Sequence, residues 1–153
     1  MIVYRISACK YISQLNGYGA FLNGGRWNSK DRFMLYASCS PALALVETLA
    51  HFSIHNSPDN YCILMLDVPD YLISEFPKDK LPSDWQVSPS PYSLKKIGDS
   101  FLNQQQFVGL KVPSAIIEYD FNLLLNPMHP SFHQIKIVQQ NTFNLDKRVL
   151  KKT

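Results

Sequence analysis

The chain has 153 residues, 46% of them hydrophobic and 18% charged, and its net charge is +3 at pH 7. This length predicts a single domain, 1–153, with one core, and the composition excludes a disordered or fibrous protein. Part of the positive charge lies in a basic tail from about residue 147. The charge therefore does not predict a folded nucleic-acid surface.

Residues 2–7 alternate apolar and polar side chains, which predicts a strand with Tyr4 and Arg5 on opposite faces. A glycine-rich loop at 16–25 and a second strand at 33–38 follow. Ser40 and Pro41 then form a helix start, a hydroxyl cap followed by proline, and the helix should reach about residue 54. The apolar run 61–69 predicts a buried central strand.

Four prolines between residues 71 and 91 predict an irregular crossing with at most a short strand. A second helix should follow at 93–107, weakened by Gly98. We then expect a strand directly after Pro113, a short apolar stretch at 122–130, a strand at 132–140 and a last edge strand at 143–150. The pattern is that of an α+β protein, a mixed and mostly antiparallel sheet flanked by a few helices.

Glu47 is the acidic residue of the first predicted helix, and it lies at the border of that helix's apolar stripe. This position leaves two readings open, a solvated residue or a carboxylate in the rim of a cleft. Arg26 follows two glycines, and such a turn suits either the surface or close contact with phosphate. Tyr36 ends a strand and Ser114 begins one, where core packing and strand entry are the ordinary roles.

The metal-binding residue types give no convincing site. His51 with His55, and His129 with His133, are four residues apart, but the first pair lacks an H-E-x-x-H glutamate and the second surrounds Pro130. Cys9, Cys39 and Cys62 form no C-x-x-C pair, and we expect reduced thiols in a cytoplasmic protein. No apolar run is long enough for a signal peptide or a membrane span.

Seven motifs occur together in one order along the chain. They are VYRIS, GGRWN, LYAS, SPALALVETLAHF, KIGDSFL, VPSAII and NLLLNPMHPSF, and the match as a whole runs from residue 4 to about residue 148. In order and spacing they resemble the RES domain, the toxin of RES-Xre toxin-antitoxin pairs. Lys96, Phe101 and Asp120 depart from the pattern, which often has glutamine, tryptophan and glutamate there.

The resemblance implies a fold similar to the ADP-ribosyltransferase toxins and cleavage of the nicotinamide–ribose bond of NAD by hydrolysis or phosphorolysis. It implies catalytic roles for Arg26, Glu47 and Ser114 with Tyr36, and Arg5 matches a second phosphate contact. Glu47 would stabilise the positive charge that develops on the ribose, while the arginines hold the pyrophosphate. Tyr36 would stack on the nicotinamide ring, and Ser114 would bind the substrate by orienting the ribose or the attacking water or phosphate. NAD is then the substrate, with water or phosphate as co-substrate, and no cofactor or metal is needed.

Two other functions remain open. The same site could transfer ADP-ribose to a protein, or the chain could be a non-catalytic subunit that docks a DNA-binding repressor. The resemblance also implies a partner, an Xre-type helix-turn-helix antitoxin through which DNA is contacted only indirectly, and no membrane association.

Overall fold

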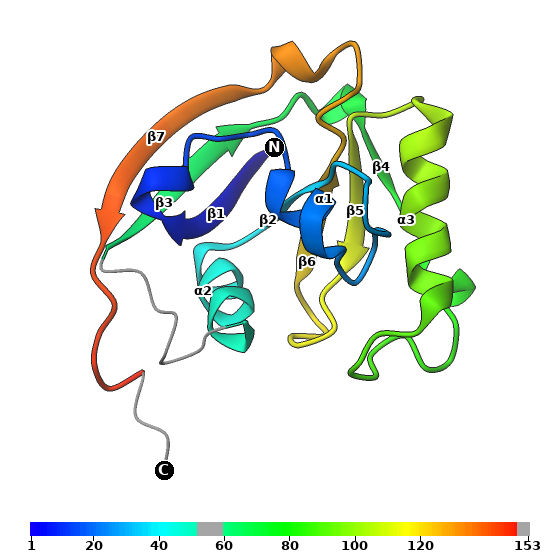
Figure 1. The fold of residues 1–153 in the computed structure, drawn as a ribbon, viewed down its shortest axis with the longest axis horizontal. Helices are drawn as coiled ribbons and strands as arrows, with labels where there is room; N and C mark the ends of the chain where they lie inside the picture. Colours follow the sequence, from blue (N-terminus) through cyan, green and yellow to red (C-terminus); the bar gives the residue numbers. More distant parts are fainter. Residues whose placement is uncertain (52–59, 150–153) are drawn as a thin grey trace.

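A computed structural model of the protein describes residues 1–51 and 60–149. The strands in these residues are β1 (Ile2–Ala8), β2 (Leu35–Ser38), β3 (Tyr61–Asp67), β4 (Ile73–Glu75), β5 (Gly109–Pro113), β6 (Phe121–Leu125) and β7 (Lys136–Phe143). They form one sheet in the order β4-β5-β6-β2-β1-β3-β7 (Figure 1). Only β4 and β5 pair in parallel within the described sheet, so the predicted α+β class is confirmed.

Helices in the described residues are α1 (Tyr18–Asn23), α2 (Pro41–Ala50) and α3 (Tyr92–Gln104), with short 3-10 turns η1 (Cys9–Tyr11), η3 (Asp70–Leu72), η4 (Lys78–Lys80) and η5 (Phe132–Gln134). The predicted start of α2 is confirmed, because the Ser40 hydroxyl accepts a hydrogen bond from the Leu43 N–H and Pro41 takes the first turn. The predicted end at residue 54 lies outside the described residues. None of these helices combines the length and the apolar character that a membrane crossing requires.

Register divides the central strands into two faces. On one face lie Val3, Arg5, Leu64 and Leu66, together with the β2 and β6 residues Leu35, Ala37, Leu123 and Leu125. On the other face Tyr4 pairs with Ser38 and Ser38 with Asn122, while Tyr36 pairs with Leu124. This second face is covered by α3, whose buried side chains pack with Leu110, Val112 and Leu124. Residues of α2 also contact β1 and β2.

The sequence suggested a loop for the glycine-rich segment 16–25, but this segment contains the helix α1. Gly17 enters this helix with a left-handed φ of 69°. The ring of Phe21 stacks on that of Phe33 at 4.3 Å between centroids. Contacts of this kind stabilise a short helix that its own propensity would not.

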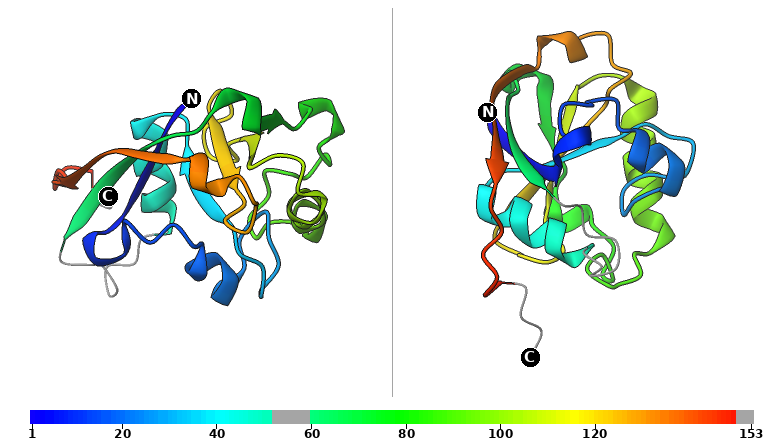
Figure 2. Two further views of the ribbon diagram at one scale, coloured as in Figure 1. Left: turned by 90° about the horizontal axis from the view of Figure 1, so that it is seen from above. Right: turned by 60° about the vertical axis from the view of Figure 1, so that its left-hand side comes forward.

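Three further predictions were wrong in position or kind. The strand near Pro113 ends at that proline and does not follow it, and Ser114 begins a turn. The edge strand beside β3 is β7, which corresponds to the strand expected at 132–140 but begins at Lys136 and ends at Phe143 (Figure 2). Residues 144–149 form no strand, so the additional edge strand expected at 143–150 is wrong. The strand β3 lies between β1 and β7 as expected of an interior strand, but its side chains are buried on alternate positions only.

The cysteine prediction also fails. Cys9 and Cys62 form a disulfide, with their Cα atoms 4.8 Å apart, and Cys39 alone is a free thiol. The antiparallel pairing of β1 with β3 sets Ala8 opposite Tyr61 and so brings the two cysteines together. Sequence spacing cannot show such a contact, because it depends on strand register.

Gly98 is a packing requirement of α3 and not only a weak point in it. A Cβ atom at this position would lie 1.6 Å from the carbonyl oxygen of Trp27, which is backbone and cannot rotate away. Both Gly98 and Trp27 are buried. The absence of a side chain therefore lets α3 rest directly on the turn that follows α1.

We expect Gly98→Ala to destabilise the protein, because the helix must move away from Trp27. Overpacking of this kind costs about 2–3 kcal/mol, which for a chain of this size lowers the melting temperature by roughly 4–12 °C. Thermal unfolding followed by circular dichroism measures this. The matched control is Gly19→Ala in α1, where a Cβ meets nothing within 4 Å; equal melting temperatures for the two variants would contradict the packing argument.

Candidate active site

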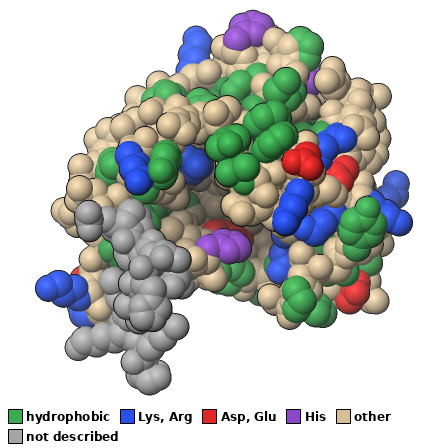
Figure 3. Space-filling view, in the orientation of Figure 1, with side chains coloured by type: hydrophobic (Ala, Val, Ile, Leu, Met, Phe, Trp, Pro, Cys, Tyr) green, Lys and Arg blue, Asp and Glu red, His purple; other side chains and the backbone are tan. Residues whose placement is uncertain are grey.

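The Glu47 carboxylate is held inside the fold by two donors on one oxygen. Its Oε1 accepts hydrogen bonds from Ser114 Oγ at 2.9 Å and from Asn122 Nδ2 at 2.6 Å. No side chain or backbone group of the described residues donates to Oε2. Glu47 is half-buried, and the surface is hollowed on the side of the molecule where α2 lies (Figure 3). Between the two readings of Glu47, this geometry favours the cleft.

Ser114 is brought to Glu47 across 67 residues of sequence. Its side chain is fully buried, and its hydroxyl oxygen also accepts the N–H groups of Ile116 and Ile117, both at 3.1 Å. A hydroxyl has one proton to donate and two lone pairs. All three are used here, so Ser114 orients Glu47 and has no hydrogen-bonding capacity left for a substrate.

Asn122 was not selected by the sequence analysis, yet it is the second ligand of the carboxylate. It is half-buried and comes directly before the buried residues of β6, and its Oδ1 accepts a hydrogen bond from Ser38 Oγ at 2.8 Å. Two residues earlier, Asp120 accepts hydrogen bonds from the Ser40 hydroxyl and from the Phe121 N–H. The start of β6 and the residue before it thus bind both the end of β2 and Ser40, the residue that caps α2.

The polar residues of the site form two clusters, one around Glu47 and a second around Arg26. Arg26 lies in the turn before β2. Its Nη1 donates to the backbone oxygens of Trp85 at 2.9 Å and Val87 at 3.1 Å. These bonds fix the guanidinium against the segment between η4 and α3. Its other two nitrogens have no hydrogen bond to described residues, so they are free to bind an anion.

The Tyr36 hydroxyl holds the same turn from beneath. It donates to Asn28 Oδ1 at 2.7 Å and accepts the Trp27 N–H at 3.1 Å. A Cβ at Gly25 would lie 2.5 Å from this hydroxyl. The glycine is therefore needed for the close approach of Tyr36, whereas the sequence suggested close approach of a ligand. Burial raises the pKa of the Tyr36 phenol, and the nearby charges of Asp99 and Arg26 act on it in opposite directions.

The two clusters are joined by β2. Tyr36 and Ser38 are two residues apart on one face, which is about 7 Å along a strand. Tyr36 serves the Arg26 turn, and Ser38 serves Asn122 and so Glu47. The strand therefore fixes the arginine turn and the carboxylate at one spacing.

The helix α3 secures the turn through residues of the KIGDSFL motif and its neighbour. Lys95 Nζ donates to the Gly25 carbonyl at 2.9 Å, and Asp99 accepts from the N–H and hydroxyl of Ser29 at 3.1 and 2.6 Å. Together with the contact at Gly98, these bonds position Arg26 without touching it.

Arg5 is not brought to either cluster. It shares the opposite face of the sheet with Val3, and its Nη1 donates to the Ile12 carbonyl at 3.2 Å. Burial lowers the pKa of its guanidinium. Contact between Arg5 and a phosphate stays a prediction, and this placement does not support it.

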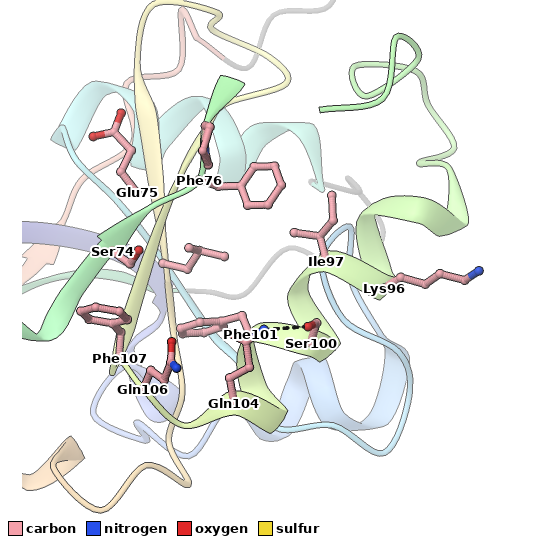
Figure 4. A pocket seen from close by; sticks show the side chains of 12 residues that line it. Ser74, Glu75, Phe76, Lys96, Ile97, Ser100, Phe101, Gln104, Gln106 and Phe107 are labelled. Atoms are coloured by element: carbon pink, nitrogen blue, oxygen red, sulfur yellow. Dashed lines mark hydrogen bonds between the residues drawn. The ribbon is translucent and has the colours of Figure 1, made fainter. Parts of the chain in front are cut away.

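Two of the positions that depart from the RES pattern lie apart from the Glu47 and Arg26 clusters. Lys96 and Phe101 line a pocket of about 410 Å³ between α3 and β4, where the rings of Phe76, Phe101 and Phe107 converge (Figure 4). No predicted site residue lines this pocket. Asp120, the third departure, binds Ser40 as described above.

Two of the described histidines, His129 and His133, bond backbone carbonyl groups. His129 Nε2 bonds the Gln105 carbonyl at 2.9 Å, and His133 Nδ1 bonds the Pro130 carbonyl at 2.8 Å. His55 lies outside the described residues. In residues 1–51 and 60–149 no three side chains of the metal-binding types gather, and the prediction of no metal site stays a prediction.

Comparison with a solved structure defines the class of fold. The chain resembles the structure of the M. tuberculosis MbcT–MbcA toxin–antitoxin complex with a TM-score of 0.75 and 20% identity, over 93% of this chain and 83% of that one. This likeness shows a mixed fold of the MbcT toxin type.

Sequence comparison gives the family. The RES domain matches residues 2–146. A Photorhabdus laumondii protein named Toxin Res is 37% identical over 153 residues, covering 99% of this chain and 98% of that protein. The Prs ADP-ribosylating toxin of a Sphingobium species is 33% identical over 141 residues, covering 90% and 88%. The chain therefore belongs to the RES domain family and is a toxin of the RES type.

The buried phenol of Tyr36 predicts a pH-dependent difference between the native protein and Tyr36→Phe. Tyrosines of an unfolded chain ionise near pH 10. Because the pKa of Tyr36 is raised in the fold, its contribution to stability is complete below pH 10 and is lost as the pH rises further. Tyr36→Phe removes two hydrogen bonds, so at neutral pH its free energy of unfolding should be lower than that of the native protein by about 1–3 kcal/mol.

At about pH 11 this gap should narrow by roughly 1.4 kcal/mol. Denaturant unfolding at pH 8 and pH 11 measures it. Tyr119→Phe is the control, because Tyr119 is 93% exposed and its variant should show no such change. A gap for Tyr36→Phe that is constant with pH would contradict the assignment.

Proposed function

We propose that the protein is a toxin enzyme that cleaves the nicotinamide–ribose bond of NAD. The observation that carries the proposal is the Glu47 carboxylate, bound on Oε1 by Ser114 and Asn122 and without a hydrogen bond from the described residues on Oε2. A carboxylate fixed in this way is suited to a reaction in which positive charge develops on a bound sugar.

The chemistry fits one carboxylate. Departure of nicotinamide leaves a ribose with oxocarbenium character, and the charge of Glu47 would stabilise it. At the same time, Oε2 of Glu47 would accept a hydrogen bond from a ribose hydroxyl. Nicotinamide leaves as a neutral molecule, so no acid is needed to protonate it. A site with a single acidic residue is therefore sufficient.

The second cluster would hold the rest of the substrate. Arg26 has two nitrogens free for the pyrophosphate, and Tyr36 has its ring fixed by its hydroxyl, where it could stack on nicotinamide. Ser114 would act through Glu47 and not on the substrate, since its hydroxyl is fully used. Holding both ends of NAD against the carboxylate lowers the entropy cost of reaction.

The acceptor of ADP-ribose distinguishes two forms of the proposal. Water or phosphate as acceptor makes the protein an NAD glycohydrolase or phosphorylase. A protein acceptor makes it an ADP-ribosyltransferase, and the name of the Sphingobium relative favours that alternative. We further propose action in the cytoplasm and neutralisation by an Xre-type antitoxin, which the toxin–antitoxin complex of the structural neighbour supports in kind.

Glu47→Gln tests the catalytic role. The variant keeps the shape of the side chain but removes its charge, so the rate of nicotinamide release should fall about 100-fold or more, and growth inhibition in cells should be lost. Glu75→Gln is the control, because Glu75, on β4, is exposed and pairs with Lys111 of β5. Growth inhibition that persists in Glu47→Gln would favour the non-catalytic docking role instead.

The acceptor is decided by incubating the purified protein with NAD in three conditions: alone, with phosphate, and with a cell lysate. Free ADP-ribose, ADP-ribose 1-phosphate and labelled protein bands report water, phosphate and protein as acceptors. The bound antitoxin must be removed first. No nicotinamide release in any condition would refute both enzymatic forms.

A further inference from the structure

We propose that Asn122, together with Ser38, is a positioning pair that sets the orientation of the Glu47 carboxylate. The pair touches Glu47 through one hydrogen bond and needs no contact with the substrate. The inference rests on the proposed function, because the orientation of Glu47 matters to a reaction at the ribose.

The chemistry of the three groups fixes which way the amide faces. An ionised carboxylate only accepts hydrogen bonds, so the group 2.6 Å from Glu47 Oε1 must be the amide nitrogen of Asn122. The amide oxygen then faces Ser38 and accepts its hydroxyl at 2.8 Å. The carboxylate therefore sets which way the amide faces, and the bond to Ser38, whose hydroxyl can donate or accept, adds a second contact that holds the amide in place.

The donors reach Glu47 from the two ends of one turn. Ser114 follows β5 and Asn122 begins the body of β6, and the strands are closed by the pairing of Pro113 with Phe121. Because both donors bind the same oxygen, they hold the plane of the carboxylate as well as its place. The other oxygen, Oε2, receives no hydrogen bond from the described residues. A hydrogen bond to a charged acceptor is also stronger than one between neutral groups.

Strand register, and not local sequence, creates the pair. Ser38 is the last residue of β2 and lies directly opposite Asn122 on β6. Ser38 is 4% exposed, so its hydroxyl is shielded from water that would compete for the amide oxygen. The bond between Ser40 and Asp120 lies beside it and holds the first residue before α2 to the same strand.

Asn122→Asp tests the proposal, because it keeps the shape but replaces the donor with a second carboxylate. At pH 7.5 we expect the rate of nicotinamide release to fall about 100-fold, as for loss of one fixed donor, with a much smaller change in KM for NAD. Two carboxylates this close share a proton as the pH falls. The shared proton restores a donor, so the activity of the variant relative to the native protein should rise toward pH 5.

A merely structural role would give a loss that does not vary with pH, and that result would overturn the proposal, as would a native rate at pH 7.5. Asn141→Asp is the matched control, because Asn141 is exposed on β7 and its variant should keep the native rate and pH profile. Melting temperatures of all variants, measured at both pH values, separate unfolding from loss of rate.

Two further measurements keep the test decisive. Ser38→Ala should reduce the rate less than Asn122→Ala does. The double variant should be no slower than Asn122→Ala alone, since both substitutions act through the hydrogen bond between Asn122 and Glu47. If the two rate reductions multiply in the double variant, the proposal is contradicted. The side-chain amide protons of Asn122, observed by NMR, should shift in Glu47→Ala even if the native protein does not consume NAD. Unchanged amide resonances would refute the contact itself, whereas an inactive native protein would refute only the proposed function.

Discussion

The register of β2 against β6 is the constraint on which the rest of the site depends. It places Ser38 opposite Asn122 and Tyr36 opposite Leu124, so that the side chains serving Glu47 and the arginine turn share one face. A slip of one residue would turn this set to the opposite face of the sheet. Leu123 and Leu125 are buried on one face of β6 and Leu124 on the other, so a slip would exchange leucine for leucine there. The interaction that the slip would break is the hydrogen bond between Ser38 and Asn122.

The site is divided between a rigid anchor and a braced turn. The carboxylate is anchored by the β5–β6 connection, whereas Arg26 sits in a turn that has little regular structure of its own. That turn is braced from three sides, by the Tyr36 hydroxyl, by Lys95 and Asp99 of α3, and by the backbone oxygens that Arg26 itself binds. The position of Arg26 thus depends on residues outside its own turn as well as on the bonds that Arg26 makes itself.

Much of this could be predicted from the sequence. Periodicity and capping found β1, β2, β3, α2 and α3, and the likeness to RES motifs selected Glu47 and Ser114, which the structure joins by a hydrogen bond. Asn122 could not be found in this way, because an asparagine in a strand carries no signal until its neighbour across the sheet is known. The pairing of Cys9 with Cys62 was hidden for the same reason. Gly25 was noticed, but its purpose depended on a tyrosine 11 residues later in the chain.

The outer strand β7 has consequences for how the isolated chain behaves in solution. It has eight residues, nearly all of them exposed, and no described strand pairs with its outer side. Between residues 137 and 143 it has neither proline nor charge, the usual protections of such an edge. Its open row of backbone groups is a template for pairing with another chain. The isolated protein should therefore self-associate at high concentration unless another chain covers this edge.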